Sequence, residues 1–275
     1  MNTPLLSDDP HDPDALHDPD DPDDRILKTL RTRRRGPVLT VELNVPERGN
    51  VVDEAMLDDL LSVLDDQDPS VRVLVLTAAG QDFCLGGDRE EFAGHLAQDP
   101  TGNGIRVSGV KARRVCDALT SHPAVTIARV QGRAVGAGFA LALACDLRVG
   151  ADTATFRLPE LALGLPTAWG GLLPRLISEV GAASVREFIL TGRPLAAQEA
   201  LGLSVLQRVV PEDALDAAVD KWARPLLRRS PPAVRVTKTL LNSLTASTRL
   251  ADASVLDPEL MAAVASEVHH MRTTR

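Results

Sequence analysis

Two segments rich in aliphatic and β-branched residues, 71–77 (VRVLVLT) and 124–130 (AVTIARV), constrain the fold of this chain most strongly. Each segment reads as a strand. Each is followed by a glycine-containing loop and then by a helical segment, which begins at Asp88 in the first case and after Gly138 in the second. Strands that alternate with helices in this way predict an α/β fold with crossover connections.

The rest of the first two hundred residues continues this alternation. Apolar residues at helical or strand spacing predict helices at 53–64 and 105–119, and strands at 38–43, 146–150 and 153–156. Residues 132–138 form a predicted turn of small residues that opens into an apolar helix through Ala144. Asp88, followed three residues later by Glu91, fits a capping box, so Asp88 is predicted to be a helix cap rather than a catalytic acid.

From residue 211 the pattern becomes helix after helix, so we divide the chain into a core domain (25–210) and a C-terminal helical region (211–275). The last predicted helix, 257–272, carries an apolar stripe formed by Leu260, Met261, Val264 and Val268. Such a stripe packs either on the chain's own body or on a neighbouring subunit, and the sequence does not decide between the two.

The first 24 residues differ sharply in composition from the rest. They hold nine of the 38 acidic residues, five prolines, and no lysine or arginine. Such a segment has too little apolar surface to offset its ordering entropy, which predicts a disordered acidic tail. The acidic and basic residues of the remaining chain almost balance, and aromatics are only 3% of the whole. Nucleic-acid binding is therefore not expected.

Other common site types find no support in the sequence. The three cysteines are widely spaced and odd in number, and the histidines outside the tail do not cluster with other ligands, so no disulfide framework and no metal site are expected. The phosphate-binding loop, the GxSxG elbow and HExxH are all missing. With no signal peptide and no long apolar run, we expect a cytoplasmic protein that does not enter the membrane.

Two glycine-containing loops are the strongest candidates for chemistry. Residues 82–88 (DFCLGGD) and residues 136–138 (GAG) each follow a predicted strand and precede a helix. Small residues at a helix start leave backbone N–H groups free beside the positive end of the helix dipole. Two such loops could direct two N–H groups at one carbonyl oxygen that becomes anionic during a reaction.

These residues resemble the crotonase superfamily, the enoyl-CoA hydratase/isomerase group, over about residues 36–245. The resemblance rests on the order and spacing of four stretches: 36–50 (GPVLTVELNVPERGN), 83–88 (FCLGGD), 122–146 (HPAVTIARVQGRAVGAGFALALACD) and 156–176 (FRLPELALGLPTAWGGLLPRL). It implies a crotonase-like spiral of ββα units, and trimers or hexamers in which the C-terminal helices pack between subunits.

The resemblance also implies roles for individual residues. The backbone N–H groups of Leu85 and Ala137 would bind a thioester carbonyl oxygen, and Glu160 would be the catalytic acid/base. Without the resemblance, Glu160 would read as an ordinary solvated carboxylate. The glycines of the two loops would contact the substrate: Gly86, Gly87, Gly136 and Gly138.

Ala140 stands where the resemblance places the first of the two glutamates that hydratases use. One carboxylate suffices to move a double bond, so the resemblance favours an isomerase, with a hydratase, a decarboxylase or a specialised biosynthetic enzyme as alternatives. A catalytically silent thioester-binding subunit would also lack a catalytic glutamate. It therefore remains a hypothesis of a different class.

The implied substrate is an acyl-CoA, or an acyl thioester on a carrier protein, with CoA as part of the substrate and no separate cofactor. By the resemblance, Arg48 and Lys238 would meet the CoA phosphates, although both could equally be solvated surface residues. Trp169 would line the acyl pocket or belong to the core.

Overall fold

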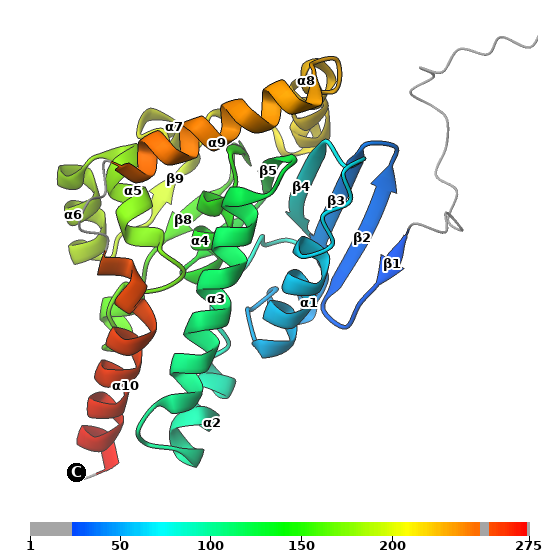
Figure 1. Ribbon diagram of the computed structural model, residues 1–275. Coiled ribbons are helices and arrows are strands. Elements are labelled where there is room, and N and C mark those ends of the chain that lie inside the picture. The colour runs from blue at the N-terminus through cyan, green and yellow to red at the C-terminus, as the bar shows by residue number, and fades with distance from the viewer. Residues whose placement is uncertain (1–23, 248–252, 274–275) are drawn as a thin grey trace, which may run out of the picture.

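A computed structural model describes residues 24–247 and 253–273 of the chain (Figure 1). The predicted disordered tail lies outside the described residues except for Asp24, whose carboxylate accepts a hydrogen bond from the backbone N–H of Arg34 at 3.3 Å. The ordered chain begins directly after it, with a short strand at Arg25–Ile26.

The strands in chain order are β1 (Arg25–Ile26), β2 (Leu30–Arg35), β3 (Val38–Leu43), β4 (Val73–Ala78), β5 (Val125–Val130), β6 (Arg133–Val135), β7 (Leu147–Ala151), β8 (Thr155–Arg157), β9 (Leu195–Ala196) and β10 (Arg208–Val210). The α-helices are α1 (Glu54–Leu64), α2 (Arg89–Gln98), α3 (Asn103–Ser121), α4 (Ala137–Ala144), α5 (Leu172–Val180), α6 (Ala182–Thr191), α7 (Ala197–Gly202), α8 (Leu215–Leu227), α9 (Pro231–Ser247) and α10 (Asp257–Thr273). Short 3₁₀ helices lie at Pro46–Arg48, Glu160–Leu163, Glu212–Ala214 and Ala253–Leu256.

The strands form a large and a small sheet. In the large sheet the order is β1-β2-β3-β4-β5-β7-β10, with β3 to β10 parallel and the antiparallel strands β1 and β2 at one edge. The small sheet has the order β6-β8-β9. The predicted α/β fold with crossover connections is confirmed.

Successive chain segments alternate between the two sheets. After β5 joins the large sheet, β6 joins the small one and α4 follows; β7, β8 and α5 repeat this order. The segment after β4 follows the same path, because Cys84 forms a bridge with Ala134 of β6 before α2 begins. This is the spiral of ββα units that the resemblance implies.

Local sequence signals account for most of these elements. The alternating segment 38–43 is β3, and the predicted helix at 53–64 begins after Asp53, whose carboxylate accepts a hydrogen bond from Met56 N at 2.8 Å. One difference concerns residues 132–138, which were expected to be a turn. Residues Arg133–Val135 form β6 instead, because β8 and Cys84 both pair with this segment.

The core is aliphatic, as the scarcity of aromatic residues predicts. Strand β4 is buried along its whole length, and so is α4. The rings of Phe139 in α4 and Phe156 in β8 lie 5.0 Å apart between centroids. This contact joins α4 to the strand that leads to Glu160.

The C-terminal region is helical, as predicted, but it is not separate from the core. Buried residues of α8, among them Leu215 and Val219, belong to the main hydrophobic cluster. Helix α10 lies along α3 (Figure 1), where Gly109 leaves room for Pro258. The buried face of α10 is formed by Met261, Ala262 and Ala265. The predicted stripe was only partly right, because Leu260 is 47% exposed.

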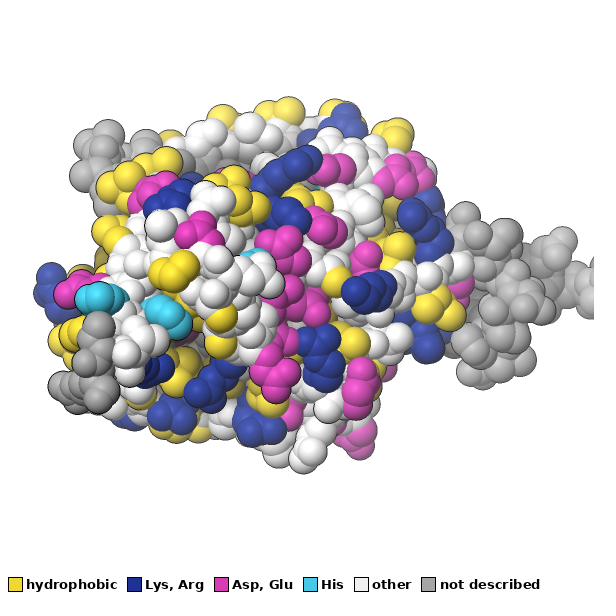
Figure 2. Space-filling view, turned by 90° about the horizontal axis from the view of Figure 1, so that it is seen from below, with side chains coloured by type: hydrophobic (Ala, Val, Ile, Leu, Met, Phe, Trp, Pro, Cys, Tyr) yellow, Lys and Arg dark blue, Asp and Glu magenta, His cyan; other side chains and the backbone are white. Residues whose placement is uncertain are grey.

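The surface carries charges of both signs. Figure 2 shows one face on which acidic and basic side chains are interspersed with apolar ones. Among the described residues, no helix is both long and apolar enough to span a membrane.

Candidate active site

The first glycine-containing loop offers a different amide from the one expected. The N–H of Leu85 donates to the backbone oxygen of Gly49 at 2.9 Å, so it is not available to a substrate. Val52 pairs with Gly87 as a parallel bridge, in which Gly86 O and Asp88 N face Val52. The N–H of Gly87 therefore points to the opposite side, and it has no hydrogen-bond partner within the described part of the chain. The Leu85–Gly49 hydrogen bond contradicts the prediction that the Leu85 N–H binds the substrate, and the free amide of this loop is that of Gly87.

The second loop ends on an amide that is also free. Gly136 is the N-cap of α4 and has φ +51° and ψ −114°, a backbone conformation that favours glycine. No side chain caps this helix end. The N–H of Ala137, the first helical residue, has no partner among residues 24–247 and 253–273. It lies at the positive end of the helix dipole, where a developing negative charge is stabilised.

Glu160 begins the 3₁₀ helix that follows β8, and its carboxyl group reaches the second loop. Its Oε1 atom lies 2.9 Å from the point that a Cβ atom on Gly136 would occupy. Its Oε2 atom is buried and has no hydrogen-bond partner in the described structure. Burial raises the pKa of Glu160 to about 7, because the charged form loses its hydration without gaining a cation.

The three segments meet at Gly136. The same Cβ position on Gly136 lies 3.9 Å from Gly86 Cα, and a Cβ atom on Gly86, which has φ +103°, would lie 3.2 Å from Val135 O. Two loops with free amides and one protonatable carboxyl group therefore converge. This arrangement can bind an oxygen that becomes anionic and can move a proton beside it.

Ala140 lies one helical turn beyond Ala137 and is 3% exposed. It lines a cavity of about 30 Å³ together with residues of α3 and of the segment 170–175. The lining includes Cys116, Thr120 and Arg175 but does not include Glu160. The cavity can hold one or two water molecules.

The two cations expected at the CoA phosphates are both engaged by carboxylates. Lys238 is 8% exposed, donates to Ala124 O at 2.9 Å and pairs with Asp146 at 2.7 Å. Its assignment to CoA is wrong, because this ammonium group is buried between α9 and β5. Arg48 is half-exposed and pairs with Asp53 and Asp88, so its contact with CoA stays a prediction.

The remaining candidates lie beside the site or in the core. Trp169 is half-buried against the main hydrophobic cluster, and its contact with an acyl chain stays a prediction. Gly138 packs against Cys84, since a Cβ atom there would lie 2.6 Å from Cys84 Cβ. This glycine therefore brings α4 close to the first loop, and its contact with a ligand stays a prediction.

Sequence reasoning missed the free amide of Gly87 and a cluster at the other end of α4. The cluster consists of Arg148, Arg175 and Glu179. In the sequence, the adjacent glycines Gly86 and Gly87 mark this loop as a candidate. Which backbone N–H of the loop stays free depends on hydrogen bonds with Gly49 and Val52, and no local pattern predicts these. No local pattern marks the arginines, because β7 and α5 bring them together.

Comparison with known proteins agrees with this geometry. Residues 33–273 match the family model described as enoyl-CoA hydratase/isomerase. The chain is 37% identical over 221 residues to a carnitinyl-CoA dehydratase from Salmonella arizonae, covering 78% of this chain and 80% of the relative. It is 35% identical over 215 residues to a mevalonyl-coenzyme A hydratase from Beauveria bassiana, covering 73% and 74%.

A solved structure shares the same architecture. The crystal structure of an enoyl-CoA hydratase/isomerase from Xanthobacter autotrophicus Py2 superimposes with a TM-score of 0.79 at 28% identity, covering 87% of this chain and 88% of the other. The family match spans both loops and Glu160, the groups that converge at Gly136. The chain belongs to the enoyl-CoA hydratase/isomerase family, within the crotonase superfamily, and is an enzyme of acyl-CoA chemistry.

Proposed function

We propose that this enzyme shifts the double bond of an enoyl thioester, with Glu160 as its single acid/base. The thioester oxygen is held by the N–H groups of Gly87 and Ala137. The carboxylate of Glu160 removes a proton from the carbon α to the carbonyl of a β,γ-unsaturated thioester. The resulting dienolate is stabilised by the two N–H groups, and Glu160 returns the proton to the γ-carbon. The product is the α,β-unsaturated isomer.

The observation that carries this proposal is the buried carboxyl group of Glu160, whose pKa is about 7, beside two free amides. A group with a pKa near neutrality can both accept and return a proton at neutral pH. The alanine at position 140 supports a mechanism with one carboxylate, since a methyl group cannot activate water.

Hydration of an α,β-unsaturated thioester is the second candidate. It is supported by a relative named as a hydratase and by the cavity at Ala140, which can hold water. In this case Thr120, which lines the cavity and whose hydroxyl group donates to Ala144 O, would accept a hydrogen bond from the water molecule.

The two reactions are separated by product analysis. The purified enzyme is incubated with matched β,γ- and α,β-unsaturated CoA thioesters, and the products are identified by mass and retention time. Faster isomerisation than hydration supports the proposal, and efficient hydration by the wild type contradicts it. A protein that binds both thioesters and converts neither would instead be a silent binding subunit.

The proposal extends to the form in which the substrate arrives and to assembly. We propose a CoA thioester as substrate, with a carrier-bound thioester as the alternative. We also propose a homotrimer or a pair of trimers. Exposed apolar residues on the outer side of α9 support this assembly: Val236, Leu240, Leu241 and Leu244 are each at least 58% exposed. Sedimentation analysis of the purified chain tests it.

A further inference from the structure

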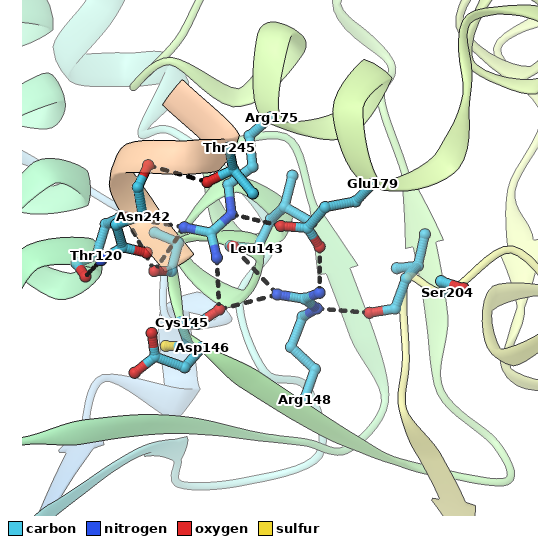
Figure 3. Close-up of polar contacts among 12 residues, drawn as sticks. Thr120, Leu143, Cys145, Asp146, Arg148, Arg175, Glu179, Ser204, Asn242 and Thr245 are labelled. Atoms are coloured by element: carbon cyan, nitrogen blue, oxygen red, sulfur yellow. Dashed lines mark hydrogen bonds and ion pairs between the residues drawn. The ribbon is translucent and has the colours of Figure 1, made fainter. Parts of the chain in front are cut away.

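The C-terminal end of α4 is held by two arginines from other elements (Figure 3). Arg148 of β7 donates to Leu143 O at 3.2 Å and to Cys145 O at 2.9 Å. Arg175 of α5 donates to Ala144 O at 3.0 Å and to Cys145 O at 2.9 Å. Three successive backbone oxygens at this helix end therefore accept hydrogen bonds from guanidinium groups.

One carboxylate holds both arginines in place. Glu179 accepts from Arg175 Nε at 2.8 Å through Oε1 and pairs with Arg148 through Oε2 (Figure 3). Arg148 also donates to Val205 O at 2.6 Å. Its side chain is 2% exposed and that of Arg175 is 17% exposed. Burying two guanidinium groups is costly unless each is paired and hydrogen-bonded, and here each of them is.

The opposite end of α4 cannot be held in the same way. Its first amide, Ala137 N–H, has to stay free for the substrate oxygen, and no side chain caps Gly136. The helix has eight residues, all buried, and so it is about 12 Å long. At its N-terminal end the chain is held through backbone bonds before the helix, where Gly136 N–H donates to Arg157 O at 2.9 Å and β6 pairs with β8. Within the helix, the axial position is set by the packing of its apolar side chains and by the arginines at its far end. These cations also lie at the negative end of the helix dipole.

We propose that Arg148 and Arg175, fixed by Glu179, are positioning residues that hold α4 so that Ala137 N–H stays aimed at the substrate oxygen. The inference rests on the proposed function, because it assigns a purpose to the alignment of that amide. A displacement of about 1 Å at a reacting group lowers rates by about 10²-fold in other enzymes, so a loosened helix is expected to affect turnover more than binding.

Arg175 is the residue to vary, since it is less deeply buried than Arg148. Arg175→Gln removes the charge, and Arg175→Lys keeps the charge but cannot fork to both of the oxygens that Arg175 contacts, Ala144 O and Cys145 O. Arg193→Gln is the control, because Arg193 likewise forms ion pairs with carboxylates, Glu187 and Glu199, but does so on the surface and makes no hydrogen bond with α4 in the described part of the chain. All variants are assayed at a temperature at which circular dichroism shows them folded.

The first readout is the exchange of substrate α-protons in heavy water, together with the Kd of a saturated acyl-CoA. We expect kcat for this exchange to fall about tenfold or more in Arg175→Gln and to recover in part in Arg175→Lys. The Kd of both variants for the saturated acyl-CoA should stay within about threefold of the wild-type value. Arg193→Gln should match the wild type. A lower melting temperature with unchanged kcat would show a purely structural role and would overturn the proposal.

The second readout does not depend on activity. Amide hydrogen exchange, followed by mass spectrometry, reports the protection of residues 140–144 of α4. Arg175→Gln should lose protection there by about tenfold or more, while Arg193→Gln should not. Unchanged protection would overturn the proposal. A wild type that fails to exchange substrate protons would contradict the proposed function alone, and the amide exchange would still decide whether the arginines hold α4.

Discussion

Glu160 Oε1 lies 2.9 Å from the point that a Cβ atom on Gly136 would occupy. The carboxyl group that we propose as the acid/base thus lies against Gly136, the N-cap residue of α4. Gly136 itself places no side chain between the base and the start of the helix. The position of the base and the geometry of the helix start are therefore coupled.

Substitution of Gly136 tests this coupling. In Gly136→Ala the new methyl group would collide with the carboxylate, and alanine disfavours φ +51°. We expect turnover to fall by about 10²-fold, of the order seen when an oxyanion donor is lost. Gly181→Ala is the control, since φ there is +97° but nothing lies within 4 Å. Equal turnover losses in the two variants would show that backbone strain alone is responsible.

The pKa of Glu160 makes the stability of the protein depend on pH. Folding raises this pKa from its ordinary value near 4.5 to about 7, so the native state binds the proton more tightly than the unfolded state. The resulting stabilisation is fully present below pH 4.5 and is lost as the pH rises to 7, by up to about 3 kcal/mol. Glu160→Gln removes this loss. Urea unfolding at several pH values should show the variant more stable than the wild type at pH 8, with the gap closing toward pH 4.5.

Ala140 is the position at which the reaction type can be altered. Ala140→Glu should raise hydration relative to isomerisation, because the new carboxylate could orient a water molecule, and the adjacent cavity has room for that water. The gain is expected to be small, since a buried carboxyl group tends to stay protonated. Ala140→Gln has almost the same size without the charge and serves as control. Product ratios from matched thioesters give the answer, and equal ratios in both variants would contradict a role for the carboxylate.

Lys238 is expected to matter for folding rather than for CoA. Lys238→Met leaves Asp146 without its buried cation and should lower the free energy of unfolding by about 3 kcal/mol. The Kd for CoA, measured by calorimetry, should not change. Selective loss of CoA affinity at unchanged stability would restore the phosphate role that the sequence suggested.

The sequence predicted the elements whose signals are local. Strand β3 and helix α1 follow from apolar spacing, and the cap at Asp88 is confirmed, since its carboxylate accepts from Glu91 N at 2.9 Å. The reciprocal half of the capping box does not form. The Glu91 carboxylate accepts a hydrogen bond from the backbone N–H of Glu54 at the start of α1 instead. Tertiary contacts redirected a side chain whose local pattern was correct.

The site could be predicted in outline but not in its hydrogen bonds. The two loops followed from their glycines and from their position between a strand and a helix, whereas the roles of Ala137 and Glu160 followed from the resemblance. The choice between Leu85 and Gly87 depends on which amide faces Gly49, and this depends on pairing between segments far apart in the chain. The burial of Lys238 depends in the same way on how α9 docks against β5.

The most direct test of the central claim is the exchange of the α-protons of a saturated acyl-CoA in heavy water, followed by mass spectrometry for the wild type and Glu160→Gln. Exchange by the wild type should rise about tenfold per pH unit below pH 7 and level off above it, because only the carboxylate form of Glu160 removes a proton. In Glu160→Gln exchange should fall by about 10²-fold or more while thioester binding persists. Exchange at the wild-type rate in Glu160→Gln would contradict the assignment of Glu160 as the base.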